Sequence, residues 1–125
     1  IIVLSDGGDT RSRYSDEKAL KMAIAAQATI YTIDISTHAE RTRFQNTKVL
    51  KNFAEKSGGR FISAQNGQSL REILKNLADE LRTQYTLSYQ PTNETKDGKW
   101  REIELRVARP NLNIRTRKGY NAPKN

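Results

Sequence analysis

The chain has 125 residues, a formal net charge of +8 at pH 7 and a mean hydropathy of −0.81. This length suits a single domain, and the absence of cysteine excludes disulfide bonds, cysteine-ligated zinc and cysteine nucleophiles. No apolar run is long enough to span a bilayer, and the apolar residues fall into periodic segments, which argues against disorder.

The first ten residues carry the clearest functional signal. Residues 1–4 are apolar and branched, which predicts a strand buried on both faces of a parallel sheet. Ser5, Asp6 and Asp9 follow in a glycine-containing loop at the carboxyl end of this strand. Open α/β sheets bind ligands at that edge, and cations such as Mg²⁺ take oxygen ligands. The three side chains are therefore oxygen donors at the place where such a fold puts its site.

The position of this strand in the chain is unusual. A buried strand needs neighbours on both sides, yet no residue precedes it, and the only methionine is Met22. We therefore expect the chain to be a fragment or a processed product. The outer edge of its first strand would pair with a missing segment or with another chain.

The next elements predict alternating helices and strands. Ser15 is a candidate N-cap for a helix through residues 18–27, and the β-branched residues 29–35 predict a second strand. A helix over residues 47–56 would end at a glycine C-cap, and a strand over residues 60–64 would follow. Ser69 and Glu72 have the spacing of a capping box, which predicts the start of a leucine-striped helix.

The apolar period changes from helical to twofold after residue 84. Residues 85–90, 101–107 and 112–117 alternate apolar and polar side chains, which predicts an antiparallel three-stranded meander followed by a loosely ordered tail. Trp100 is out of phase, so we expect a bulge or a strand start near Arg101. The predicted fold is thus an α/β half-domain over residues 1–83 with a β extension over residues 84–125. Core packing of the extension is the favoured role of its aromatic side chains, with an aromatic binding face as the alternative: Tyr85, Tyr89, Trp100 and Tyr120.

The positive charge is concentrated near the end of the chain. Residues 96–125 contain nine Lys or Arg and three Asp or Glu. This bias permits a nucleic-acid-binding function, but most of these residues alternate with apolar ones. We therefore favour a solvated sheet face, or a basic surface for an acidic partner or a cell-envelope polymer.

The sequence does not predict an enzyme. His38 is the only imidazole, and the chain has no Gly-x-Ser-x-Gly, P-loop or Gly-x-Gly-x-x-Gly motif. A lone histidine without cysteine does not make a zinc site. Asp34 ends a predicted strand, and we interpret it as an acceptor for loop amides rather than as a metal ligand.

The order of these motifs resembles the second half of a von Willebrand factor type A domain, and in detail the related proteins abundant in Acidobacteria. The resemblance covers nearly the whole chain and rests on these segments: Ser5-Asp6-Gly7, Ser57-Gly58-Gly59, Tyr85-Thr86-Leu87-Ser88-Tyr89-Gln90-Pro91, Asp97-Gly98-Lys99-Trp100-Arg101-Glu102-Ile103 and Arg117-Lys118-Gly119-Tyr120-Asn121-Ala122-Pro123. It implies a Rossmann-like three-layer αβα fold.

The resemblance also implies a metal-ion-dependent adhesion site built from three loops. Only the third is present, and its aspartate matches Asp6, which in the family holds the ion through water. The loops with Asp-x-Ser-x-Ser and the ligating threonine are missing, so Mg²⁺ or Mn²⁺ is expected in an intact parent and not as a tight ligand of this chain. Ser5 and Asp9 are weaker metal candidates.

The favoured function is protein–protein or adhesion-type binding. The family resemblance implies an extracytoplasmic location and a partner that supplies an acidic residue. Two alternatives stay open. One is a metal-free assembly module, including a homo-oligomer, that pairs through its open strand edge. The other is a basic nucleic-acid-binding domain, whose affinity would fall steeply with salt.

Overall fold

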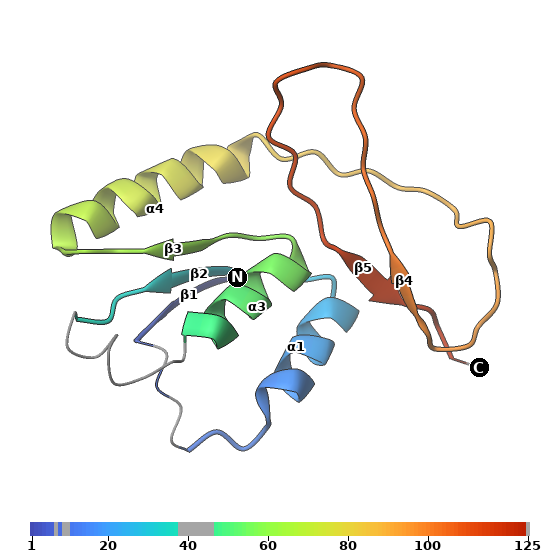
Figure 1. Ribbon diagram of the computed structural model, residues 1–125, viewed down its shortest axis with the longest axis horizontal. Helices are drawn as coiled ribbons and strands as arrows, with labels where there is room; N and C mark the ends of the chain where they lie inside the picture. The colour runs from blue at the N-terminus through green and yellow to red at the C-terminus, as the bar shows by residue number, and fades with distance from the viewer. Residues whose placement is uncertain (7, 9–10, 38–46, 125) are drawn as a thin grey trace.

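The computed structural model describes residues 1–6, 8, 11–37 and 47–124. Its main sheet has three parallel strands in the order β1 (Ile2–Ser5), β2 (Tyr31–Asp34) and β3 (Phe61–Ser63). Helices α1 (Asp16–Ala25) and α3 (Thr47–Ser57) lie on one face of this sheet, and α4 (Gly67–Arg82) lies on the other (Figure 1). The prediction of an α/β fold is confirmed at this level.

The core forms on both faces of the central strand β2. Alternate side chains of a strand point to opposite faces, so Tyr31 and Ile33 contact α4 through Leu77. The hydroxyl of Thr32 faces α3, where it donates a hydrogen bond of 2.9 Å to the carbonyl of Leu50. All four residues of β2 are buried, as expected for a strand with parallel neighbours on both sides.

Strand β1 differs from its prediction. Ile2 and Leu4 are 40% and 45% exposed, because β1 is the outer strand of the described sheet. It pairs with β2 in register from Ile2 opposite Tyr31 to Ser5 opposite Asp34. The prediction that this strand is buried on both faces is therefore wrong for the residues that the structure describes.

The helix signals are mostly confirmed. The side chain of Ser15 caps α1 by accepting the N–H of Lys18, and Gly58 ends α3 with a φ of +85°. The capping box of α4 is shifted by three residues. Asn66 is the N-cap and accepts the N–H of Ser69 at 2.8 Å, while the Ser69 hydroxyl accepts the N–H of Asn66 at 3.0 Å. Asparagine caps as well as serine, so the helix begins earlier than the Ser69–Glu72 spacing predicts.

The C-terminal strands are rearranged relative to the prediction. β4 (Trp100–Glu102) pairs antiparallel with β5 (Gly119–Asn121), without a bulge, and residues 85–90 and 112–117 are in no strand. The predicted meander is thus a two-stranded sheet, and its second strand lies in the tail that we expected to be loosely ordered. The final residues are also held: Pro123 accepts the N–H of Gly98 at 3.2 Å.

A polar network joins the C-terminal segment to the α/β layers. Glu80 on α4 binds the guanidinium of Arg115 at 2.7 Å and accepts a hydrogen bond of 3.3 Å from the hydroxyl of Tyr31. Gln84 donates to the same hydroxyl at 2.8 Å. Residues from β2, α4 and the segment before β5 therefore meet at the amino end of the parallel sheet.

Candidate functional site

The carboxyl ends of the three parallel strands form a polar edge. Ser5 ends β1, Asp34 ends β2 and Ser63 ends β3, and the strand register places the three side by side. Such an edge is where open α/β sheets bind ligands. We call Ser5, Asp6, Asp34, Ser36 and Ser63 the carboxyl edge.

Asp6 is the exposed carboxylate of the carboxyl edge. Its Oδ1 accepts the N–H of Gly8 at 3.0 Å, which is the local turn that aspartate favours after a strand. The structure therefore places Asp6 where the sequence predicts it. Asp9 and His38 lie outside the described residues.

Asp34 is the buried carboxylate of this edge, and it accepts hydrogen bonds from Ser36 and Ser63. Its residue is 1% exposed, and its Oδ1 accepts both the N–H of Ser36, at 2.9 Å, and the hydroxyl of the same residue. Its Oδ2 accepts the hydroxyl of Ser63 at 3.3 Å. Asp34 thus links the ends of β2 and β3, in agreement with the interpretation as a loop-amide acceptor.

Metal-binding side chains are not clustered in the part of the chain that the structure describes. Within residues 1–6, 8, 11–37 and 47–124, no three histidine, cysteine, aspartate or glutamate side chains are gathered to hold an ion. Asp6 supplies one exposed carboxylate, whereas Mg²⁺ requires near-octahedral coordination by oxygen. The donor set of this edge therefore does not fit a bound cation by its own residues.

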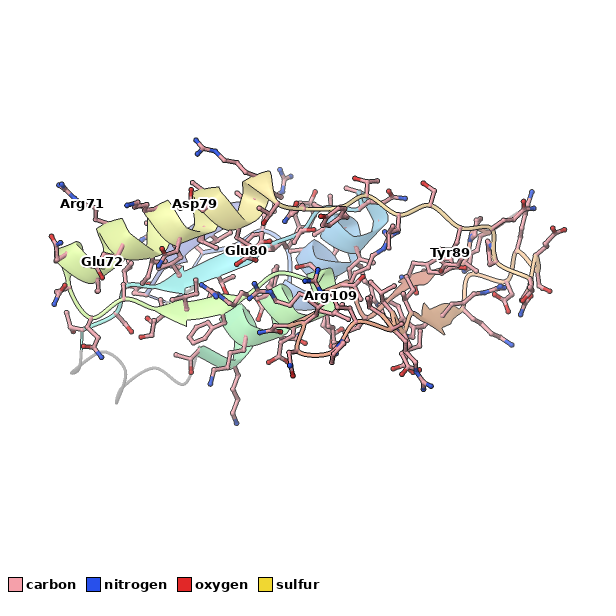
Figure 2. All side chains as sticks on the ribbon, turned by 90° about the horizontal axis from the view of Figure 1, so that it is seen from above. Arg71, Glu72, Asp79, Glu80, Tyr89 and Arg109 are labelled. Atoms are coloured by element: carbon pink, nitrogen blue, oxygen red, sulfur yellow. The ribbon has the colours of Figure 1, made fainter. Side chains whose placement is uncertain are left out.

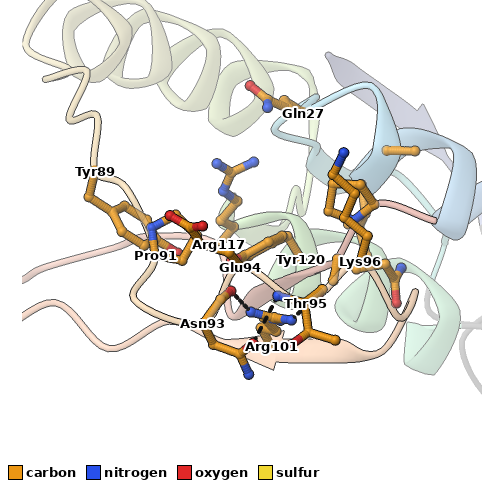
Figure 3. Close-up of a pocket in the computed structure, with 15 residues that line it drawn as sticks. Gln27, Tyr89, Pro91, Asn93, Glu94, Thr95, Lys96, Arg101, Arg117 and Tyr120 are labelled. Carbon is orange, nitrogen blue, oxygen red and sulfur yellow. Dashed lines mark hydrogen bonds between the residues drawn. The ribbon is translucent and has the colours of Figure 1, made fainter. Parts of the chain in front are cut away.

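A cavity of about 450 Å³ lies at the opposite end of the molecule. The end of α1 lines one side of it, and residues 89–96 and the strand β5 line the others (Figure 3). Figure 2 shows Tyr89 on the side of the two-stranded sheet, far from Arg71 and Glu72 at the other end. The sequence does not predict this cavity. The features that point to its lining are the basic residues near the end of the chain and the tyrosines of the extension.

The aromatic residues of the extension do not form a core. Tyr85 is 91% exposed and Tyr89 is 58% exposed, because residues 85–90 pair with no strand that could cover them. Trp100 is also exposed. Tyr89 and Tyr120 instead line the cavity. Partial loss of hydration raises the pKa of Tyr89, and a hydrogen bond with Tyr120 raises it further by a smaller amount.

Basic side chains line the same cavity, and one of them, Arg101, is hydrogen bonded to the backbone of the loop that lines it. Arg101 donates to the backbone carbonyls of Asn93 and Thr95, the latter at 2.6 Å, and lies 3.7 Å from the carboxylate of Asp97 (Figure 3). The hydrogen bond from the backbone N–H of Lys99 and, to a smaller extent, the positive charges of Arg101 and Lys99 lower the pKa of Asp97. Arg101 therefore fixes the shape of the 93–97 loop.

The chain matches no protein-family model and no curated protein. Among solved structures, it is similar to the crystal structure of an uncharacterized membrane-spanning protein from Vibrio fischeri, with 25% sequence identity and a TM-score of 0.53. The match covers 64% of this chain and 46% of the other, so this chain spans less than half of that protein. Among the helices described here, none is long and apolar enough to cross a membrane.

Proposed function

We propose that this chain is the C-terminal part of a von Willebrand factor type A-like module, and that it binds another protein through the carboxyl edge. The order β1, α1, β2, α3, β3, α4, with helices on both faces of a parallel sheet, is compatible with the Rossmann-like fold that the resemblance implies. The observation that carries the proposal is the position of Asp6, exposed at the carboxyl end of β1 and next to the polar end of β2, with the end of β3 beyond it.

The proposed contact is made directly by side chains of the protein rather than through a bound cation. The buried Asp34 holds the ends of β2 and β3 together, so the edge is a defined surface rather than a set of independent loops. Asp6 lies on that surface and can accept hydrogen bonds from donors of a partner, which are stronger when one group is charged. The resemblance further supports an extracytoplasmic setting for this contact.

Capture of a partner by the tagged chain, followed by binding measurements with the purified partner, tests the proposal. Asp6→Asn removes the charge but keeps an oxygen that can accept the N–H of Gly8, so the loop is retained. We expect it to weaken binding roughly tenfold, as for loss of a charge-assisted hydrogen bond. Asp79→Asn, the same change on exposed α4, is the matched control and should leave the affinity unchanged.

Two results would contradict this function. Equal loss of affinity in the Asp6→Asn and Asp79→Asn variants would show that only the overall charge matters. Loss of binding in EDTA, restored by Mg²⁺, would show that the contact requires a cation and not the protein groups alone.

A second candidate function is assembly through the outer edge of β1. Ile1 accepts Tyr31 N–H, and Ser5 accepts Ile35 N–H, so these residues point toward β2. Backbone groups alternate in direction along a strand, which turns those of Ile2 and Leu4 outward. Exposed apolar side chains on an edge strand favour pairing with another strand, and a second copy of this chain would supply one.

A further inference from the structure

The cavity between the end of α1 and the C-terminal strands has a net positive lining. Its charged side chains are Lys96, Arg101 and Arg117 against the single carboxylate of Glu94. The elements that line it, the end of α1 and β5, lie at the end of the molecule away from which the parallel strands point (Figure 1). Its use therefore does not depend on the function proposed for that edge.

Arg117 and Lys96 are the cavity's basic groups that are not used to hold the fold within the described residues, and of the two Arg117 carries the planar guanidinium. Within the described part of the chain, its guanidinium makes no hydrogen bond or ion pair, whereas Arg101 binds two carbonyls (Figure 3). Arg117 is a half-buried residue in the wall of the cavity. Its guanidinium presents a fork of N–H donors that matches a carboxylate in two parallel hydrogen bonds.

The backbone of Arg117 is held in place by close packing on α3. A Cβ atom at Gly58 would lie 2.4 Å from the nitrogen of Arg117, so the two backbones touch at the end of the helix. Two residues farther on, the chain enters β5 and pairs with β4. Arg117 is therefore anchored on both sides, which reduces the entropy that it would lose on binding an anion.

Apolar and aromatic side chains line the cavity together with uncharged polar ones. Tyr89, Pro91 and Tyr120 lie around the basic groups (Figure 3), and Ile24 of α1 and Ala122 belong to the same lining. Rings and methylene groups can therefore pack beside the charge. This combination suits a ligand with an anionic head on an aliphatic stem, as in a glutamate side chain.

The surroundings favour a carboxylate over a phosphate. The cavity meets α1 at its C-terminal end, where the helix dipole is negative, and the last turn of α1 has no basic residue. Glu94 adds a further negative charge. A group with two negative charges would meet more repulsion here than a group with one.

We propose that this cavity binds a glutamate side chain of an extended acidic peptide, with Arg117 as the receptor of its carboxylate. Residues of the segment 89–96, which is in no helix and no strand, line one wall, and a peptide can lie along them. The partner class is therefore a protein segment rich in glutamate.

Titration of the ¹⁵N-labelled chain with a blocked tetraglutamate peptide tests this proposal. We expect shifts of the backbone amides around Tyr89 and Tyr120, with smaller changes on α4. Arg117→Gln should weaken the affinity at least roughly tenfold, because a charge-assisted pair is lost. Arg117→Lys, which keeps the charge and removes the fork, should weaken it by an intermediate factor. Arg109→Gln makes the same charge change in a turn outside the cavity and should alter the affinity less than about twofold.

Four outcomes would overturn the proposal. These are no binding of tetraglutamate, equal binding of a tetraglutamine peptide, equal losses in the Arg117→Gln and Arg109→Gln variants, or tighter binding of inorganic phosphate at the same amides. The urea midpoint of each variant shows whether it is folded, and Arg117→Lys supplies the test if Arg117→Gln is not. Partner binding at Asp6 is measured separately, so either proposal can fail alone.

Discussion

Glu80 is the side chain at which three separate segments of the chain meet. One carboxylate oxygen accepts the hydroxyl of Tyr31, and the other binds Arg115 at 2.7 Å. Arg60 approaches the same oxygen at 3.9 Å. Because these groups are partly buried, loss of the carboxylate leaves donors without a strong acceptor. Glu80 is therefore one of the residues that link the parallel layers to the C-terminal segment.

Glu80→Gln is expected to lower the free energy of unfolding by about 1–3 kcal/mol, the range for hydrogen bonds to charged groups. Urea denaturation measures it. Asp79→Asn is the control, because Asp79 and Arg82 form an exposed pair on the same helix and their loss should cost less than about 1 kcal/mol. Equal destabilisation by the two variants would contradict the role assigned to Glu80.

Tyr31 makes this network sensitive to alkaline pH. Burial, and next the negative charge of Glu80, raise the pKa of Tyr31 above the ordinary tyrosine value. The Tyr31 hydroxyl therefore keeps its proton to a higher pH in the folded state than in the unfolded state. The stabilisation that follows from this difference is complete below roughly pH 10, the unfolded pKa, and is lost as the pH rises through the folded pKa. Tyr31→Phe should flatten this alkaline loss in unfolding experiments from pH 8 to 11, whereas the same slope in both proteins would exclude Tyr31 as its source.

At the level of elements, the sequence predicts the helices and the parallel strands well, because their signals are local. Ser15 and Gly58 have the residue types that helix ends require, and β2 lies within the segment that β-branched residues predict as a strand. The error at α4 has the same local origin. Asn66 and Ser69 form the capping box of α4. Ser69 and Glu72 have the spacing of a second capping box, which the helix does not use.

The C-terminal strands were harder to predict because alternation shows which face is apolar but not which strand is paired. Residues 85–90 alternate without pairing, whereas β5, which pairs with β4, contains Gly119 and reads as a tail. The carboxyl edge and the cavity differ in predictability for the same reason, because one depends on a local signal and the other on contacts between distant segments. The position of Asp6 follows from one strand end, but the cavity combines the end of α1 with Tyr89 and Arg117, which lie far apart in the sequence.

Gly58 is the point where α3 and the C-terminal segment touch. Its φ of +85° is strained for any residue with a Cβ atom, and that atom would meet the backbone of Arg117 at 2.4 Å. Gly58→Ala should therefore lower the free energy of unfolding by at least about 2 kcal/mol. Gly67→Ala is the control: it starts α4 with open space around it, and should leave stability unchanged or raise it by up to about 1 kcal/mol. A smaller loss for Gly58→Ala than about 0.5 kcal/mol would contradict the close contact.

At the scale of the whole molecule, the net charge opposes association between copies of the chain, whereas its exposed apolar residues favour association. The net charge of +8 repels a second copy, while β1 exposes Ile2 and Leu4 on an edge that pairs with no other described strand. Salt screens the repulsion between exposed charges but does not weaken apolar burial or strand pairing in the same way. Association between copies should therefore strengthen as the salt concentration rises, whereas binding to nucleic acid should weaken.

Sedimentation measured over a range of protein concentrations, at low and at moderate salt, distinguishes these two behaviours. We expect a monomer–dimer equilibrium that shifts toward the dimer with salt. The double variant Ile2→Lys, Leu4→Lys should remain monomeric, because lysine on an edge strand opposes pairing. Lys18→Glu, Lys21→Glu changes the charge in the opposite direction on exposed α1 and should leave the dimer in place. A dimer that persists in the β1 variant would place the interface elsewhere, and a monomer at every concentration would exclude assembly through this edge.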